Sequence, residues 1–250
     1  MIKGAGQIYS RPGVTPVPFC LTLANLDHLN QTLGDKHSCH FLSSLLSAAE
    51  NDLFSTFTYP KRRREWLGGR LAAKAATLSL LQTGITPEAL PTLSILPGED
   101  GSPRLSSSLL AADTLPALSI SHSDRFAVAM AAKADACGID IQKISAKTER
   151  VAERFCEPGE LQLLLKHTPL LSGQERLTLL WSAKEALKKA LLHDQPVIFQ
   201  GVVLQSLHWD DYFTLQLKFP GDRNRPAEVT ALVLEDYILA YTFARRTDHA

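Results

Sequence analysis

The stretch "CGIDIQKIS", residues 137–145, has the pattern of a short buried strand, yet it carries a carboxylate where an apolar side chain is expected. Alternation along a strand sends Ile139 and Ile141 to one face and Asp140 and Gln142 to the other. The two polar side chains therefore share one side of the strand. We expect them to form part of a site.

A second stretch, "LLWSAKEALKKALL" (residues 179–192), predicts a helix with one apolar stripe. Trp181, Glu185 and Lys189 lie in a row, four residues apart, on the opposite side. In a simple amphipathic helix, Glu185 and Lys189 would be a solvated pair that contributes only about 0.2–0.5 kcal/mol. The large aromatic beside them indicates instead that this face is covered, and a covered carboxylate needs a cation or hydrogen bonds to offset its desolvation.

Enough chain separates Asp140 from Glu185 for the strand and the helix to bring both carboxylates to one point. Two carboxylates a few ångströms apart repel each other unless a cation lies between them. Mg²⁺ is the usual ion of such a sparse site, because it keeps several waters and accepts substrate phosphates as ligands. The pattern thus predicts a phosphate-bearing substrate, with acid–base chemistry by two carboxylates without a metal as the alternative.

The composition is that of an ordinary globular protein, with 250 residues, 45% of them hydrophobic and 21% charged. Lys plus Arg equals Asp plus Glu at 26 each, so no overall field favours nucleic acid. The four cysteines include no C-x-x-C pair, which argues against zinc and disulfides and fits a reducing cytoplasm. Without a signal-peptide pattern or a long apolar run, we expect a cytoplasmic protein that does not enter a membrane.

Strand and helix patterns follow one another in two rounds, the first to about Lys133 and the second from about Cys137. Helices are expected at 40–49, at 61–82, from about 148 and at 175–192. Strands are expected at 18–26, at 137–145 and in the C-terminal part, and residues 115–133 are expected to form a hairpin that turns at 123–125. Residues 96–105 are expected to form a loop. This layout predicts an α+β fold of two packed lobes rather than a parallel βαβ sheet.

The two quoted stretches together resemble the signature of the 4′-phosphopantetheinyl transferases, which pairs Gly-Ile/Val-Asp with Trp/Phe-Ser/Cys/Thr-x-Lys-Glu-Ala/Ser-x-x-Lys. The resemblance extends, in the family's order, to "RRREWLGGRLAAKAA" (62–76), "GEDGSPRL" (98–105) and "ISHSDRFAVAMA" (120–131), and it covers most of residues 60–192. The length resembles the larger monomeric type, named for activators of nonribosomal peptide and polyketide synthases.

The resemblance implies two similar α+β lobes in pseudo-twofold relation, with coenzyme A bound in the cleft between them. Residues 1–136 would contact the nucleotide of coenzyme A, and residues 137–250 would supply the metal site, the catalytic helix and the carrier-protein contacts. The implied reaction is of the holo-[acyl-carrier-protein] synthase type. It transfers the 4′-phosphopantetheine arm of coenzyme A to a serine of an apo acyl or peptidyl carrier protein, with Mg²⁺, and releases 3′,5′-ADP.

Carried over by position, Asp140 and Glu185 look like the ligands of Mg²⁺, or of Mn²⁺. Glu185, or a metal-bound water beside it, would be the base for the acceptor serine, and Lys189 would steady the pyrophosphate or the departing 3′,5′-ADP. Gln142 stands where many members have a second acid. Its amide oxygen can still face the metal, but one negative charge is lost, so weaker Mg²⁺ binding is expected.

Five further residues match family positions for coenzyme A, although several have ordinary explanations. His122 on its own would be a common strand histidine, and the run 61–64 would be a solvated face, since four consecutive cations cannot all point one way. The resemblance assigns coenzyme A contacts to Arg70, Arg63, Ser121, His122 and Lys184.

Two rival functions remain open at the level of sequence. The first is another Mg²⁺-dependent phosphoryl transferase that uses the same carboxylates, although the chain has no G-x-x-x-x-G-K-[ST] loop to cradle phosphates. The second is a catalytically impaired protein that binds coenzyme A or a carrier protein without turnover, and Gln142 is the feature that favours it.

Overall fold

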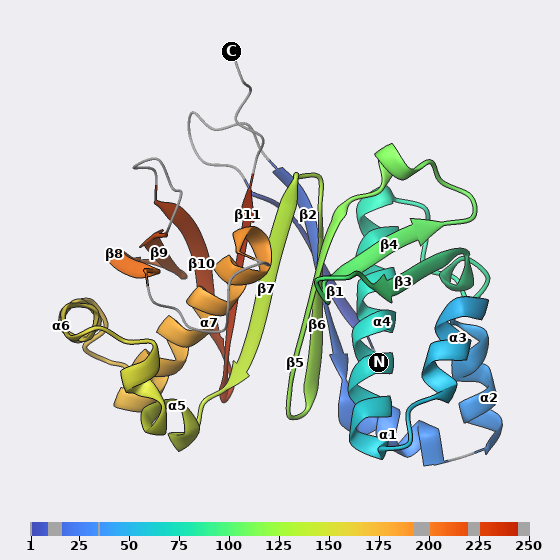
Figure 1. Cartoon of the computed structure of the whole chain (residues 1–250), viewed down its shortest axis with the longest axis horizontal. Helices are drawn as coiled ribbons and strands as arrows, with labels where there is room; N and C mark the ends of the chain where they lie inside the picture. The colour runs from blue at the N-terminus through green and yellow to red at the C-terminus, as the bar shows by residue number, and fades with distance from the viewer. Residues whose placement is uncertain (1, 10–16, 35, 193–200, 220–225, 245–250) are drawn as a thin grey trace. The chain divides into compact units, whose positions relative to one another are not determined.

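The computed structural model describes residues 2–9, 17–34, 36–192, 201–219 and 226–244 (Figure 1). The chain divides into two compact units, one that runs to Cys137 and also takes in Ala244, and one that comprises Gly138–Phe243. The structural division falls next to the boundary expected at 136/137. Each unit combines helices with an antiparallel-paired sheet, so the α+β prediction is confirmed.

The first unit is built on a four-stranded sheet in the order β1-β2-β6-β5, whose neighbouring strands all pair antiparallel. A separate hairpin joins β3 to β4. The strands are β1 (Ile2–Tyr9), β2 (Val17–Asn25), β3 (Leu93–Pro97), β4 (Pro103–Ser107), β5 (Ala117–Ser123) and β6 (Phe126–Ala132). The helices are α1 (Leu26–Gly34), α2 (Lys36–Ser44), α3 (Ala48–Ser55) and α4 (Pro60–Leu81), with short 3-10 turns at Leu90–Thr92 and Ala112–Thr114.

Helix α4 lies against this sheet, as the first unit in Figure 1 shows. Pro60 favours its start because the proline ring has a helical φ and needs no amide partner in the first turn. Small side chains make the contact: Ala72 and Ala73 of α4 and Ala127 and Ala129 of β6 are all completely buried. The helix and the sheet can therefore approach closely.

The second unit has a five-stranded sheet in the order β7-β11-β10-β9-β8. Its strands are β7 (Ala136–Lys143), β8 (Val203–Trp209), β9 (Phe213–Lys218), β10 (Ala227–Leu234) and β11 (Tyr237–Ala244). Its helices are α5 (Ala146–Arg150), α6 (Pro158–His167) and α7 (Gly173–Leu191), with a 3-10 turn at Ala152–Arg154. Helix α7 begins with a capping box between Ser172 and Glu175, and its apolar stripe, with Ala183 and Leu187 fully buried, lies in the core of this unit.

The two units share one order of elements. From β2 in the first unit and from β7 in the second, a strand is followed by short helices, a long helix and two hairpins. The last hairpin strand returns beside that starting strand, β6 beside β2 and β11 beside β7, and the first unit has β1 in addition. In the first unit the hairpin β3-β4 stands apart from the main sheet, whereas its counterpart β8-β9 extends the sheet of the second. The prediction of two similar α+β lobes is confirmed.

Two local predictions are corrected. The single helix expected at 40–49 is two helices, because Ser47 ends the run by capping α3 in a box with Glu50. The stretch 96–105 is not wholly a loop, because its ends belong to β3 and β4 and only the turn between them is irregular. The turn of the β5-β6 hairpin lies at Asp124 and Arg125, as expected, with Asp124 in the left-handed region at φ 51°. No helix in the described ranges is both long and apolar enough to cross a membrane.

Gly138 marks a close approach between β7 and α7. A Cβ atom on this residue would lie 1.9 Å from the carbonyl oxygen of Ala186 and 2.8 Å from the amide nitrogen of Ala190. Both are backbone atoms of α7, so neither can move aside as a side chain could. The glycine therefore sets the distance between this strand and this helix.

We expect Gly138→Ala to lower the free energy of unfolding by about 1–3 kcal/mol, because the added methyl group forces α7 away from β7. Urea denaturation measures this change. Gly159→Ala, in the first turn of α6, is the matched control: no heavy atom lies within 4 Å of its added Cβ. It should leave stability unchanged or raise it by up to about 1 kcal/mol. Equal stability of the two variants would contradict the packing argument.

Candidate metal and phosphate sites

Asp140 is held at the face of β7 that is turned toward α7. Its neighbours Ile139 and Ile141 are almost completely buried, and Asp140 itself is only 5% exposed. Lys189 of α7 donates from Nζ to Asp140 Oδ1 at 2.8 Å and to the carbonyl oxygen of Ile139 at 3.0 Å. The lysine thus ties the helix to the strand and neutralises part of the charge on the carboxylate.

Glu185 lies one turn before Lys189 on α7 and is half-buried. Burial raises the pKa of this carboxyl group, and the negative charge of Asp140 raises it further, while Lys189 and Lys188 lower it. The influence of Asp140 on this pKa means that the two carboxylates feel each other's charge. A divalent cation between them would remove that repulsion, so the pair fits the expected Mg²⁺.

Gln142 follows Asp140 on the same face of β7 by strand alternation. Its Nε2 donates to the carbonyl oxygen of Lys143 at 3.4 Å, and no described residue donates to its Oε1. Mg²⁺ is commonly held by one or two carboxylates together with waters and substrate phosphates. Among the described residues, no group of three or more His, Cys, Asp or Glu side chains is placed so that it could hold a metal ion. A role of Gln142 at the metal stays a prediction.

Two further members of the motif on α7 have structural surroundings. Trp181 packs edge-on against Phe155, with ring centroids 5.1 Å apart, which agrees with the expectation that this side of the helix is covered. Lys184 is 1% exposed and donates from Nζ to the carbonyl oxygen of Phe155 at 2.6 Å and to Glu160 Oε2 at 2.9 Å. The expected coenzyme A contact of Lys184 does not fit this environment, because its ammonium group is enclosed and paired within the protein.

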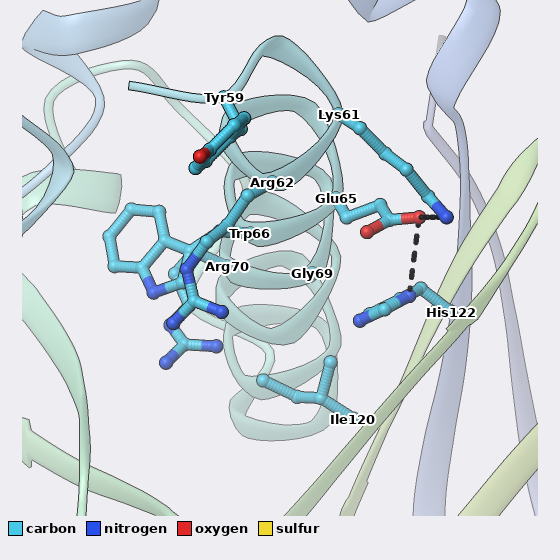
Figure 2. Close-up of a pocket in the computed structure, with 9 residues that line it drawn as sticks. All are labelled: Tyr59, Lys61, Arg62, Glu65, Trp66, Gly69, Arg70, Ile120 and His122. Atoms are coloured by element: carbon cyan, nitrogen blue, oxygen red, sulfur yellow. Dashed lines mark ion pairs between the residues drawn. The ribbon is translucent and has the colours of Figure 1, made fainter. Parts of the chain in front are cut away.

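A pocket of about 540 Å³ in the first unit contains two of the other expected residues, Arg70 and His122 (Figure 2). It lies over the first half of α4 and the end of β5, and it is lined by Tyr59, Lys61, Arg62, Glu65, Trp66, Gly69, Arg70, Ile120 and His122. Figure 2 shows Arg62, Trp66 and Arg70 on one side of the helix and Lys61, Glu65 and His122 on the other.

Arg70 is anchored by a hydrogen bond and by a contact with an aromatic ring. Its Nε donates to the carbonyl oxygen of Ile95 at 3.0 Å, and its guanidinium carbon lies 4.7 Å from the centroid of the Trp66 ring. Burial lowers the pKa of Arg70 to about 10, against a smaller opposing effect of Glu50, so the side chain is still charged at neutral pH. A planar, oriented guanidinium group suits a bidentate contact with a phosphate.

His122 and Lys61 lie on the other side of the pocket around one carboxylate. Glu65 Oε1 is 3.7 Å from His122 Nδ1 and 3.8 Å from Lys61 Nζ. The pocket thus has three permanent cations and one histidine against a single acid, so its charge suits a phosphate-bearing ligand. Ser121, the neighbour of His122, is 7% exposed and does not line the pocket, and its expected contact with coenzyme A stays a prediction.

Arg63 does not line this pocket, whereas its neighbour Arg62 does, and the expected contact of Arg63 with coenzyme A stays a prediction. The Arg63 guanidinium carbon lies 4.2 Å from the Phe54 ring centroid, and Nη1 donates to the carbonyl oxygens of Phe54 and Phe57 at 3.3 and 3.1 Å. Arg63 therefore braces the connection between α3 and α4, whereas Arg62 lines the pocket.

Sequence reasoning missed Arg62, Trp66 and Tyr59 as lining residues. A signal was present for two of them: Arg62, Trp66 and Arg70 are spaced four residues apart, so they form one row along a helix, as the quoted motif row of α7 does. Tyr59, which is 75% exposed, precedes the helix and had no such signal.

Comparison with known proteins identifies the family. The family model of the 4′-phosphopantetheinyl transferase superfamily matches residues 136–242, and that of the 4′-phosphopantetheinyl transferase N-terminal domain matches residues 50–132. A holo-[acyl-carrier-protein] synthase of Halalkalibacterium halodurans is 36% identical over 100 residues, which cover 40% of this chain and 80% of that protein. The chain belongs to the 4′-phosphopantetheinyl transferase superfamily, and it includes the N-terminal domain.

We expect Asp140→Asn and Glu185→Gln each to weaken the binding of Mn²⁺ at least about tenfold, because each removes one of the two carboxylates that would share the cation. Titration with Mn²⁺, followed by the electron paramagnetic resonance of the free ion, measures the dissociation constant. Glu153→Gln removes an exposed acid of the same unit and should bind Mn²⁺ within about twofold of wild type. Equal loss in all three variants would point to a general effect of charge.

Proposed function

We propose that this protein transfers the 4′-phosphopantetheine arm of coenzyme A to a serine of an apo carrier protein, in a reaction that depends on Mg²⁺. The carrying observation is the pair of carboxylates: Lys189 ties Asp140 of β7 to α7, and Glu185 lies one turn before that lysine, within the segment that matches the superfamily. The name of the bacterial relative, a holo-[acyl-carrier-protein] synthase, supports the same acceptor class.

In the proposed mechanism, Asp140 and Glu185 would hold Mg²⁺, which would supply neutralising charge for the pyrophosphate of coenzyme A. Glu185, or a metal-bound water beside it, accepts the proton of the serine hydroxyl group. The serine oxygen forms a bond to phosphorus as the bond from that phosphorus to the bridging oxygen breaks. The phosphopantetheine arm moves to the serine, and 3′,5′-ADP leaves.

Lys189 supports this reaction through its contact with Asp140. Because it donates to Asp140 Oδ1 and to the Ile139 carbonyl oxygen, its ammonium group is fixed beside the carboxylates. In that place it would orient Asp140 and offset the negative charge that builds up on the departing phosphate.

We assign the pocket of the first unit to the nucleotide end of coenzyme A. Arg70, Arg62 and His122 supply the charges for a phosphate, and the exposed ring of Tyr59 is available to a purine ring. The anchored Arg70 is the strongest candidate for the 3′-phosphate, because its orientation is fixed before a ligand binds.

We expect Arg70→Met to weaken coenzyme A binding about 10- to 100-fold, since a charge-assisted hydrogen bond is worth roughly 1.5–3 kcal/mol. The loss should shrink for 3′-dephospho-coenzyme A, which lacks the group that Arg70 would bind. Isothermal titration calorimetry measures both ligands. Arg63→Met, which removes the neighbouring brace, is the control and should bind coenzyme A with wild-type affinity in its folded fraction. A larger loss in the Arg63 variant would overturn the assignment.

We expect an apo acyl carrier protein to gain one phosphopantetheine arm when it is incubated with this protein, coenzyme A and Mg²⁺. Intact-protein mass spectrometry detects the gain. Asp140→Ala and Glu185→Ala should slow the transfer about 10²- to 10⁴-fold, because each removes part of the charge arrangement at the reacting phosphate. A carrier without its acceptor serine should stay unmodified. Modification of that carrier would contradict the proposed reaction.

One observation favours a second function, the binding of coenzyme A or a carrier protein without turnover. Gln142 stands where an acid would add a third carboxylate, so the metal site has one charge fewer. Unmodified carriers, despite bound coenzyme A and saturating Mg²⁺, would favour this alternative. If transfer then appears in Gln142→Glu, the missing acid is the reason for the lost activity.

A further inference from the structure

Each unit contains a lysine and a glutamate that are paired out of contact with solvent. Lys74 and Glu50 have completely buried side chains, and those of Lys184 and Glu160 are 1% exposed. A buried ion pair is seldom a strong source of stability, because the desolvation of both charges offsets their attraction. The presence of one such pair in each unit therefore calls for a different explanation.

In the first unit, the pair connects three elements. Lys74 of α4 contacts Glu50 Oε2 and donates to the carbonyl oxygen of Leu45 at 3.0 Å. Glu50 lies in the capping box of α3, where Oε2 accepts from the Ser47 amide at 2.8 Å. Its other oxygen, Oε1, accepts from the Ile95 amide of β3 at 2.9 Å.

In the second unit, the same set of contacts recurs. Lys184 of α7 donates to Glu160 Oε2 at 2.9 Å and to the carbonyl oxygen of Phe155 at 2.6 Å. Glu160 lies in the capping box of α6, where Oε2 accepts from the Glu157 amide at 2.8 Å. Its Oε1 accepts from the Leu204 amide of β8 at 2.7 Å.

The spacing of the two sets is nearly identical. Lys184 follows Glu160 by 24 residues, the same separation as between positions 50 and 74. The accepted carbonyl group lies 29 residues before the lysine in both units. The strand amide lies 45 residues after the glutamate in the first unit and 44 in the second. The two pairs thus occupy equivalent positions of an internal repeat.

The repeat allows the sequences of α4 and α7 to be aligned. In this alignment the two units differ at charged residues of the candidate sites. Aligning Lys74 with Lys184 places Arg70 opposite Leu180 and Glu185 opposite Ala75. Each unit therefore has one polar group close to its buried lysine, where the other unit has an apolar side chain. The common frame carries a different chemical group in each unit.

Each pair is also connected to its neighbouring site residue. In the first unit, Ile95 gives its amide hydrogen to Glu50 and its carbonyl oxygen accepts from Arg70 Nε, so both side chains hold one strand residue. In the second unit, Glu185 directly follows Lys184 on α7, so the rotation of the helix that seats the lysine also determines where Glu185 points.

We propose, resting on the function proposed above, that Glu50–Lys74 and Glu160–Lys184 are positioning pairs that serve separate halves of the reaction. The first pair holds Arg70 for the phosphate of the nucleotide. The second pair sets the rotation of α7 that turns Glu185 toward Asp140 and the metal. Lys184 acts through Glu185 and does not touch coenzyme A.

The test compares two double variants, Glu160→Gln with Lys184→Met, and Glu50→Gln with Lys74→Met. Removing both charges avoids a lone buried charge, which would unfold the protein. Mn²⁺ binding is measured by electron paramagnetic resonance, and coenzyme A binding by calorimetry in the presence of a chelator. Thermal unfolding of each variant provides the structural control.

We expect a crossed result. The variant at 160 and 184 should lose about tenfold in Mn²⁺ affinity and keep its coenzyme A affinity within about twofold. The variant at 50 and 74 should lose about tenfold in coenzyme A affinity and keep its Mn²⁺ affinity within about twofold. A general loss of stability cannot produce opposite patterns in two variants. Equal changes in both ligands, or no change in either, would overturn the proposal.

Conservative variants cover the case in which a double variant does not fold. Glu160→Asp and Glu50→Asp keep the charge but withdraw the carboxylate by one methylene group, and they should show the same crossed pattern with smaller changes. Carrier modification by the wild type is measured separately. A wild type that binds both ligands and modifies no carrier overturns the proposed function, whereas a crossed result would still support the positioning role. A wild type that binds neither ligand overturns both.

Discussion

A single hydrogen atom, the side chain of Gly138, permits the contact between β7 and α7 on which the candidate metal site depends. Any larger side chain would collide with the backbone of α7 at Ala186. With the strand and the helix at this distance, Lys189 reaches both Asp140 and the strand backbone, and Asp140 and Glu185 come close enough for one charge to raise the pKa of the other. The repulsion between the two acids is the property that a divalent cation would relieve.

The buried pairs and the exposed site charges have different physical roles. Lys74 and Lys184 are enclosed, and their ammonium groups are used by carboxylates and carbonyl oxygens within the protein. Arg70 and Glu185 lie next to them and are only partly buried. A ligand can compete for a partly buried charge, whereas reaching an enclosed pair would require the core to open. The protein thus separates the charges that hold its helices from those that would bind ligands.

Much of the site could be predicted from local patterns. Asp140 was identified because a carboxylate between two isoleucines is unexpected in a buried strand. Glu185 was identified because Trp181 lies four residues before it, on the same side of the predicted helix. Lys184 could not be judged in the same way, because its partner Glu160 lies on another helix and no local pattern relates the two. Arg62 and Arg63 are indistinguishable in a run of four cations until the rotation of α4 is known.

The two rounds of strand and helix patterns, the family and the pair of acids follow from the sequence alone, because periodicity, turn residues and motif spacing are properties of neighbouring residues. Which charge is enclosed and which is available depends on the tertiary structure, because burial is a property of elements that meet from distant parts of the chain. The repeat of the two lysine–glutamate pairs belongs to this second kind. No residue-level repeat is visible in the sequence, because the two units share only the few side chains that form these pairs. Those side chains are recognised as equivalent by the contacts that they make in the folded protein.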